Sequence, residues 1–298
     1  MRVFLTGASG YIGSAVLDAF ARAGHDVDAL VRNSEKAAKV QARGAHPILG
    51  DLSKPASYAD AVAAADGVVH TAFEHSPGGP AIDSTVLDVV LAPPKRRKRF
   101  VVYTSGVWVL GNCATPADET AALNPPEVVA WRPAHEQRVL NAKGLRTIVI
   151  RPGIVYGSSR GIVGDLFKDA ANSLVRVIGG GDNHWPLVHD RDLADLYLRV
   201  ATQDDASGLF HANDEGDESV NDLVEAIASH AKTKPSIRHM PLAEARKKLG
   251  PFADALVLDQ VVRSPRARAL GWNPSLHSVA GNAARLFEEW RRGTDAAR

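Results

Sequence analysis

Three glycines near the start of the chain have the spacing of a phosphate-binding turn. Gly7, Gly10 and Gly13 lie between an apolar run that predicts a buried strand (residues 2–6) and a segment that predicts a helix (residues 14–21). Gly7 permits a tight turn, Gly10 lets a pyrophosphate approach the backbone, and Gly13 lets the helix pack against the strand. The N-terminus of the helix would then face the anion. We interpret the segment as a dinucleotide-binding turn.

Ala8 stands where the usual dinucleotide fingerprint has its second glycine, so a purely structural glycine turn is the alternative. The strand before the turn and the helix after it favour the cofactor interpretation. Ser9, Tyr11 and Ile12 complete the residues that we expect to contact the cofactor here.

The end of the predicted second strand (residues 26–31) indicates which dinucleotide is bound. NAD-binding proteins of this kind carry an acidic residue there for the ribose hydroxyls. Here Val31 occupies that position, Arg32 follows it, and Asp28 lies earlier in the strand. Arg32 can pair with a 2′-phosphate, and Lys36 adds a positive charge. We therefore expect NADP rather than NAD, although an ordinary surface arginine is the alternative.

Composition excludes several classes of protein. The chain has 298 residues, of which 45% are hydrophobic, and a formal net charge of +1. Neither nucleic acid nor an acidic membrane is a predicted partner. A single cysteine, Cys113, excludes an internal disulfide. No signal peptide and no membrane-length apolar run is recognisable, so we expect a soluble, cytoplasmic protein. The expected partners are a small-molecule substrate and, as one option, a second copy of the chain; no metal site is predicted.

Short apolar strands alternate with helices through the first half of the chain, which predicts an α/β fold with a parallel sheet covered on both faces. We expect a Rossmann-type doubly wound sheet in a single unit of residues 1–298. Roughly residues 1–155 would form the dinucleotide-binding core, and 156–298 mostly a smaller C-terminal substrate lobe, with some segments returning to the core. The predicted strands are 2–6, 26–31, 46–49, 67–70, 100–103, 146–150 and 176–178. The predicted helices are 14–21, 35–43, 58–65, 82–91, 128–142, 163–171, 190–200, 220–231 and 278–291.

A basic run, Lys95 to Arg99, precedes the predicted strand at 100–103. It is typical either of a polyanion-binding or targeting patch or of a solvated turn. Pro93 and Pro94 before the run, and the buried strand after it, favour the turn.

Several motifs, in order along nearly the whole chain, resemble the extended short-chain dehydrogenase/reductase family, which includes nucleotide-sugar epimerases, dehydratases and hydroxysteroid dehydrogenases. The resemblance implies a Rossmann sheet that binds NAD(P) and a C-terminal substrate lobe. The motifs are Thr6–Gly13, Gly50–Leu52, Val69–Ala72, Tyr103–Ser105, Arg151–Gly157, Val188–Asp190, Asp192–Ala194 and Ala269–Trp272.

The resemblance also implies roles for residues after the predicted strands. Asp51 and Leu52 would line the adenine pocket, although Asp51 can equally be a helix cap. The segment Thr71, Ala72 and Phe73 would lie beside the pyrophosphate and ribose. Thr104 would contact the cofactor after the fifth strand. Pro152, Gly153 and Ile154 would lie beside the nicotinamide, although Pro152 can equally be only the end of a strand.

The family pattern breaks at the catalytic residues. The family uses a Ser or Thr, a Tyr that transfers the proton, and a Lys four residues later that holds the ribose. If Glu136 is the glutamate that ends the family's motif, Val128 replaces the Tyr and Arg132 replaces the Lys. Counting back from Gly111 places Gly106 at the Ser/Thr position, one residue after Ser105. Ser105 and Arg132 are the remaining catalytic candidates.

Other polar side chains could replace the missing groups, and each also has an ordinary structural interpretation. They are Tyr103, Tyr156, His70, Glu74, His75 and His135. Two functions from different classes remain open: an atypical NAD(P)-dependent oxidoreductase acting on a carbonyl or alcohol, and a non-catalytic NADP-binding sensor or scaffold. A sugar-nucleotide epimerase or dehydratase is a weaker third option, because its chemistry needs the missing Tyr.

Overall fold

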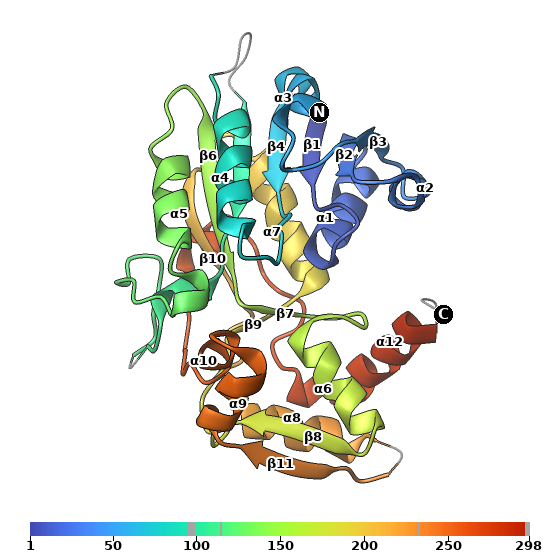
Figure 1. The fold of residues 1–298 in the computed structure, drawn as a ribbon, viewed down its shortest axis with the longest axis vertical. Coiled ribbons are helices and arrows are strands. Elements are labelled where there is room, and N and C mark those ends of the chain that lie inside the picture. Colours follow the sequence, from blue (N-terminus) through green and yellow to red (C-terminus); the bar gives the residue numbers. More distant parts are fainter. Residues whose placement is uncertain (94–98, 114, 232, 296–298) are drawn as a thin grey trace. The chain divides into compact units, whose positions relative to one another are not determined.

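The computed structural model describes residues 1–93, 99–113, 115–231 and 233–295 (Figure 1). The chain forms two compact units, each built from three segments. The first comprises Met1–Ser105, Trp131–Arg151 and Leu193–Phe210; the second comprises Gly106–Ala130, Pro152–Asp192 and His211–Arg298. The basic run at 95–98 lies outside the described residues, but Arg99 is described. Its guanidinium is buried and donates hydrogen bonds to the carbonyls of Val62, Val90 and Ala92.

A seven-stranded sheet in the order β10-β6-β5-β4-β1-β2-β3 organises the first unit. Its registered neighbours from β6 to β3 are all parallel, which confirms the Rossmann-type sheet. The strands are β1 (Arg2–Thr6), β2 (Asp26–Val31), β3 (His46–Leu49), β4 (Gly67–His70), β5 (Phe100–Thr104), β6 (Arg146–Pro152) and β10 (Gly208–Ala212).

Helices cover both faces of this sheet, which explains why its strands are continuous apolar runs. Val3, Phe4 and Leu5 of β1, for example, are buried. Figure 1 shows α4 and α5 on the near face of the sheet and α7 on the far face. The helices are α1 (Tyr11–Arg22), α2 (Ser34–Gln41), η1 (Pro55–Ser57), α3 (Ala59–Ala64), α4 (Gly79–Val90), α5 (Arg132–Leu140) and α7 (Asp190–Thr202).

Strand order reverses beside β1. The chain builds β1, β2 and β3 outward in one direction and then returns to place β4 on the other side of β1. Thr6 and His70, the last residues of β1 and β4, are register partners. In open parallel sheets the ligand lies at the carboxyl ends of the strands on either side of such a reversal. The glycine turn after β1 and the segment after β4 therefore meet where a ligand is expected.

The second unit has its own apolar core. Tyr156, Phe167, Trp185, Leu223 and Phe287 are among its buried members. Its strands are β7 (Ile154–Tyr156), β8 (Leu174–Ile178), β9 (Leu187–His189) and β11 (Ser236–Met240), paired as β7-β9 and β8-β11. Its helices are η2 (Val107–Leu110), η3 (Glu127–Val129), α6 (Gly161–Ala171), α8 (Val220–Ser229), α9 (Leu242–Leu249), α10 (Phe252–Leu256), α11 (Pro265–Ala269), η4 (Ala280–Asn282) and α12 (Ala283–Asp295).

Two expected helices begin several residues later in the structure than predicted. The helix expected at 278–291 is α12, which begins at Ala283. The helix expected from Val128 to Ala142 is α5. In the structure α5 begins only at Arg132, and Glu127–Val129 form a separate 3-10 turn. Pro133 lies in the first turn of α5. Proline has no backbone N–H to donate and clashes with the preceding turn, so it is favoured at the start of a helix and disfavoured further in. The prediction was therefore wrong about where this helix begins.

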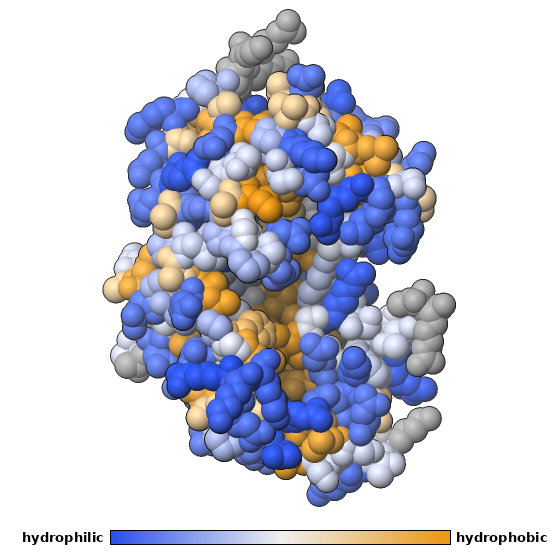
Figure 2. Space-filling view, in the orientation of Figure 1, coloured by the Kyte–Doolittle hydropathy of each residue, from blue (hydrophilic) through white to orange (hydrophobic). Residues whose placement is uncertain are grey.

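Hydrophilic side chains cover much of the face drawn in Figure 2. Within the described residues, no helix combines the length and the apolar character needed to cross a membrane.

Candidate cofactor-binding site

The glycine turn has the geometry that its sequence predicts. Gly7 has φ +79°, a backbone conformation that residues with a side chain rarely adopt. A Cβ on Gly13 would lie 2.1 Å from the Gly7 carbonyl oxygen, so only glycine lets α1 start this close to β1. Gly10 is the N-cap of α1; no side chain caps this helix, and its first turn contains no acidic residue. The positive end of α1 therefore suits a phosphate group.

The segment after β4 is hydrogen-bonded directly to the end of β1. Thr71 donates to the Thr6 carbonyl oxygen through its Oγ1 at 2.7 Å, and the Ala72 amide donates to Thr6 Oγ1 at 3.3 Å. A Cβ on Gly7 would meet Thr71 Oγ1 at 2.7 Å. These contacts bring the two segments predicted to hold the pyrophosphate against one another.

Arg32, Asp51 and Glu74 form a charged group at the ends of β2, β3 and β4. Arg32 donates from Nη1 to Glu74 Oε2 at 3.0 Å, and both side chains are substantially exposed. Asp51 Oδ1 accepts hydrogen bonds from the amide and hydroxyl of Ser53 at 2.8 and 2.6 Å. These bonds, and more weakly the charge of Arg32, lower the pKa of Asp51. The carbonyl of Leu52, the other predicted adenine contact, accepts a hydrogen bond from Tyr58.

Arg132 lies at the carboxyl end of β5. Its Nη1 donates to the carbonyl oxygen of Thr104 at 3.1 Å. Its guanidinium carbon lies 4.4 Å from the ring centre of Trp131 and 5.3 Å from that of Phe73. These two rings stack with centres 5.1 Å apart and an angle of 12° between their planes. Cation–π contacts thus hold a permanent positive charge beside the residues predicted to contact the cofactor.

This arrangement fits a dinucleotide. An uncapped helix N-terminus behind three glycines suits the pyrophosphate, and two arginines flank it along the strand ends. The model of the NAD dependent epimerase/dehydratase family matches residues 3–212. The chain belongs to this family. Membership places it among NAD(P)-dependent epimerases, dehydratases and reductases.

Related proteins agree with this assignment. An uncharacterized protein of Schizosaccharomyces pombe is 30% identical to this chain. The alignment covers 94% of this chain and 96% of that protein. A 4-hydroxy-2-methyl-3-oxo-4-farnesyl-3,4-dihydroquinoline-1-oxide ketoreductase of Stigmatella aurantiaca is 30% identical over 83% of this chain and 78% of its own. The solved structure of the human epimerase family protein SDR39U1 with NADPH aligns with a TM-score of 0.78 at 19% identity, covering 97% of this chain and 99% of that one.

Glu136 fixes the register of α5. Its buried carboxylate accepts two hydrogen bonds from Arg151 of β6, at 2.9 and 2.5 Å. Arg132 lies one turn earlier on the same helix. Val128, predicted to replace the family's Tyr, lies before α5 in a partly buried 3-10 turn of the second unit. Arg132 and Val128 therefore do not share one helix, as the family's Lys and Tyr would.

Ser105, the other catalytic candidate, directly follows β5. Its amide donates to the carbonyl oxygen of Ile150 at 2.8 Å. Its hydroxyl is buried and has no hydrogen-bond partner among the described residues. A buried hydroxyl without a partner can take part in a hydrogen bond to a bound group.

Four of the five tyrosines use their hydroxyl groups inside the protein. Burial is the main cause that raises the pKa of each, to about 12 for Tyr58. The fifth, Tyr11, begins α1. The four bonds join Tyr58 to the Leu52 carbonyl (3.1 Å), Tyr103 to Asp83 (2.8 Å), Tyr156 to Asp214 (3.0 Å) and Tyr197 to Thr104 (2.6 Å).

A buried network around Asp83 of α4 was missed in the sequence. Its carboxylate is bonded by His70 Nε2 at 2.9 Å, His135 Nδ1 at 2.7 Å and the Tyr103 hydroxyl at 2.8 Å. His70 is also bonded to Thr6 through Nδ1 at 2.6 Å. Burial alone would raise the pKa of Asp83, but the bonds from the two histidines and Tyr103 outweigh it and lower the pKa. Three polar candidates are thus engaged with a buried carboxylate.

The residues predicted to lie beside the nicotinamide belong to the second unit. Pro152 is the last residue of β6, and Ile154 begins β7. The amide of Gly153 donates to the Ala212 carbonyl at 2.9 Å. A Cβ on Gly153 would lie 2.5 Å from the carbonyl oxygen of Pro186, so glycine is required by packing here.

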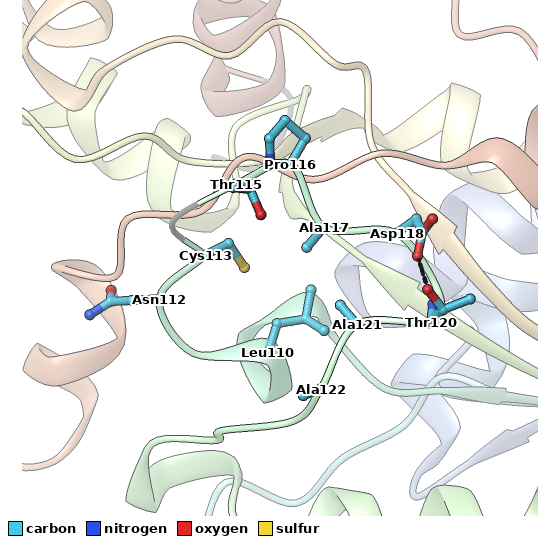
Figure 3. A pocket seen from close by; sticks show the side chains of 10 residues that line it. All are labelled: Leu110, Asn112, Cys113, Thr115, Pro116, Ala117, Asp118, Thr120, Ala121 and Ala122. Carbon is cyan, nitrogen blue, oxygen red and sulfur yellow. Dashed lines mark hydrogen bonds between the residues drawn. The ribbon is translucent and has the colours of Figure 1, made fainter.

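A separate pocket of about 370 Å³ lies in a loop region of the second unit (Figure 3). Thr120 donates its hydroxyl hydrogen to Asp118 on one side of it. Burial raises the pKa of the Cys113 thiol, which therefore stays protonated and weakly nucleophilic at neutral pH. The pocket contains none of the predicted site residues. Its lining is Leu110, Asn112, Cys113, Thr115, Pro116, Ala117, Asp118, Thr120, Ala121 and Ala122.

Proposed function

We propose that this chain is an NADPH-dependent reductase of a small carbonyl compound that works without the family's tyrosine. The observation that carries the proposal is the position of Arg132, whose guanidinium is fixed on Thr104, Trp131 and Phe73 one turn before Glu136. This is where the register puts the family's lysine. We infer that Arg132 holds the nicotinamide ribose hydroxyls, because a guanidinium donates several hydrogen bonds and stays charged.

The other contacts of the cofactor would follow the strand ends. Gly7, Gly10 and Gly13 would receive the pyrophosphate, and Arg32 the 2′-phosphate of NADP. The glycine geometry and the uncapped N-terminus of α1 support the first assignment. The exposed guanidinium of Arg32 supports the second. Bound nicotinamide would supply the hydride, and the protein would supply binding and orientation.

We assign the proton that accompanies the hydride to water. Val128 has no acidic group, and an arginine is a poor acid. Four tyrosine hydroxyls are bonded internally. Positioning of the reactants alone can still accelerate the reaction, whereas a missing general acid costs roughly two to four orders of magnitude in rate. We therefore expect slow turnover of sugar nucleotides and of the carbonyl compounds that correspond to the family's alcohols. Compounds whose reduction needs little acid assistance should react faster.

The lack of an acidic group at Val128, and the internal bonds of these four tyrosines, favour a second candidate, a non-catalytic NADP-binding sensor. Oxidation of NADPH, followed by its absorbance with a panel of carbonyl and imine compounds, separates the two. Turnover that Arg132→Ala reduces at least tenfold supports the reductase. Tight NADPH binding with no turnover across the panel supports the sensor, and no NADPH binding at all overturns both.

A further inference from the structure

Three acid–base side chains of the second unit converge where β9, α7 and α12 meet. His189 is the last residue of β9, Asp190 is the first residue of α7, and Glu289 lies on α12. One nitrogen or oxygen from each lies within 4.8 Å of the others. His189 and Asp190 are 2% and 6% exposed, and the Glu289 side chain is 19% exposed. This cluster belongs to no part of the proposed cofactor site.

Two atoms of the cluster have no hydrogen-bond partner among the described residues, although both are fully buried. They are Nε2 of His189 and Oδ1 of Asp190. A Cβ added to Gly157 would lie 2.9 Å from the first and 2.8 Å from the second, so both atoms face the same side of this glycine. A buried polar atom without a partner costs about 1–3 kcal/mol, and more when it carries charge. A group bound between the two atoms would satisfy both of them.

The remaining polar contacts orient the cluster. Ser158 donates its hydroxyl hydrogen to Asp190 Oδ2 at 2.9 Å and its amide to Glu289 Oε1 at 3.2 Å. Glu289 Oε1 also lies 3.8 Å from His189 Nε2 and 3.6 Å from the exposed guanidinium of Arg191.

The state of the imidazole ring is compatible with a ligand at Nε2. Nδ1 lies 3.4 Å from Asp190 Oδ1 and 3.3 Å from the amide nitrogen of Arg191. A cation on Nε2 requires the proton of the neutral ring to sit on Nδ1, so the ring would change tautomer on binding. This change of tautomer would remove the hydrogen bond that the Arg191 amide donates to Nδ1 at 3.3 Å.

We propose that His189, Asp190 and Glu289 form a binding site for a divalent transition cation such as Zn²⁺. One imidazole and two carboxylates suit such a cation, with water completing its coordination. The cation would satisfy both unpartnered atoms and offset the charge of the two acids. Since Glu289 comes from α12 and the other ligands from the β9–α7 junction, it would link the C-terminal helix to the core of the second unit.

Zinc titration of the full chain after removal of metals with EDTA tests this proposal, with a chelating dye as competitor. The variant is Glu289→Gln, whose side-chain oxygen can still accept the Ser158 amide. The matched control is Glu288→Gln, because Glu288 is an exposed neighbour on the same helix that pairs with Arg291. Asp190→Asn is a second variant if Glu289→Gln does not fold.

We expect one Zn²⁺ per chain in the wild type and in Glu288→Gln, and at least tenfold weaker binding in Glu289→Gln or Asp190→Asn. Zinc should raise the unfolding midpoint of the wild type and of Glu288→Gln more than that of Glu289→Gln, since a ligand stabilises the state that binds it. Absence of stoichiometric zinc binding in the wild type overturns the proposal. Equal zinc binding in Glu289→Gln and the wild type also overturns it.

Discussion

Arg32 and Glu74 form an ion pair of 3.0 Å that joins the end of β2 to the segment after β4. The pair places a negative charge beside the cation that we propose for the 2′-phosphate. Surface ion pairs of this kind are worth only about 0–1 kcal/mol, so a phosphate can displace the carboxylate. Arg32 and Glu74 would therefore set the preference between NADPH and NADH in opposite directions.

Arg32→Ala should weaken NADPH binding roughly 10- to 100-fold and change NADH binding much less. A hydrogen bond to a charged group contributes about 1.5–3 kcal/mol, and the 2′-phosphate is present only in NADPH. Calorimetric titration with both cofactors measures the two affinities. Arg238→Ala is the control, because Arg238 is equally exposed and contacts Glu244. Equal losses for both cofactors would show that Arg32 does not read the phosphate.

Glu74→Gln should have the opposite effect and tighten NADPH binding about two- to fivefold. The substitution removes a charge that repels the phosphate and releases Arg32 from a bond worth roughly 0.2–1 kcal/mol. The gain should shrink at high salt, because exposed charges are screened. Titrations at low and high ionic strength check both statements. Weaker NADPH binding in this variant would mean that Glu74 positions Arg32 rather than competing with it.

Asp83→Asn should destabilise the protein by about 3–5 kcal/mol, since it breaks a buried charged network. Asp83 is buried and accepts from two histidines and Tyr103. Asp88→Asn is the matched control: Asp88 lies on the same helix, is 69% exposed and pairs with Arg138. Urea unfolding of the three proteins gives the free energies. A loss in Asp83→Asn no larger than in Asp88→Asn would refute the importance of the network.

Asp214 should make the folded state less stable as the pH rises from about 4 to 7. Burial raises the pKa of this carboxyl to about 7. Since the unfolded chain releases this proton near pH 4, the folded state binds more protons between these values, and its advantage is lost across the window. Asp214→Asn should remove this part of the pH dependence and can still accept the Tyr156 hydrogen bond. Urea unfolding at pH 4.5 and 7 compares the two proteins; identical pH slopes would contradict the assignment.

Local patterns were enough to predict the parallel sheet and the glycine turn. Strands β2, β3 and β4 match their predicted bounds, because a short apolar run between turn residues is typical of a strand in such a sheet. The late start of α5 was not predicted, since the effect of Pro133 depends on the turn that precedes it. Asp83 was missed for another reason. Its partners His70, Tyr103 and His135 are 13 to 52 residues away, and only the folded sheet brings them together.

The cluster at His189 was equally hidden. Glu289 lies about a hundred residues from its neighbours in the sequence, and a glutamate on the C-terminal helix reads as a solvated side chain. His189 and Asp190 lie within the motif Val188–Asp190, which resembles the family and by itself indicates no metal site. Such a site can be recognised from the packing of the folded chain but not from the spacing of its residues in the sequence.

Calorimetric titration of NADPH into the wild type and Gly10→Ala tests the central claim most directly. A Cβ on Gly10 would lie 3.0 Å from the Gly7 carbonyl oxygen, within the proposed pyrophosphate cradle. Gly180→Ala is the control, because a Cβ there meets only the flexible side chain of Asp182, at 3.3 Å. We predict one NADPH per chain in the wild type and Gly180→Ala, with at least tenfold weaker binding in Gly10→Ala. Equal affinity in all three proteins, or no binding by the wild type, would contradict the account.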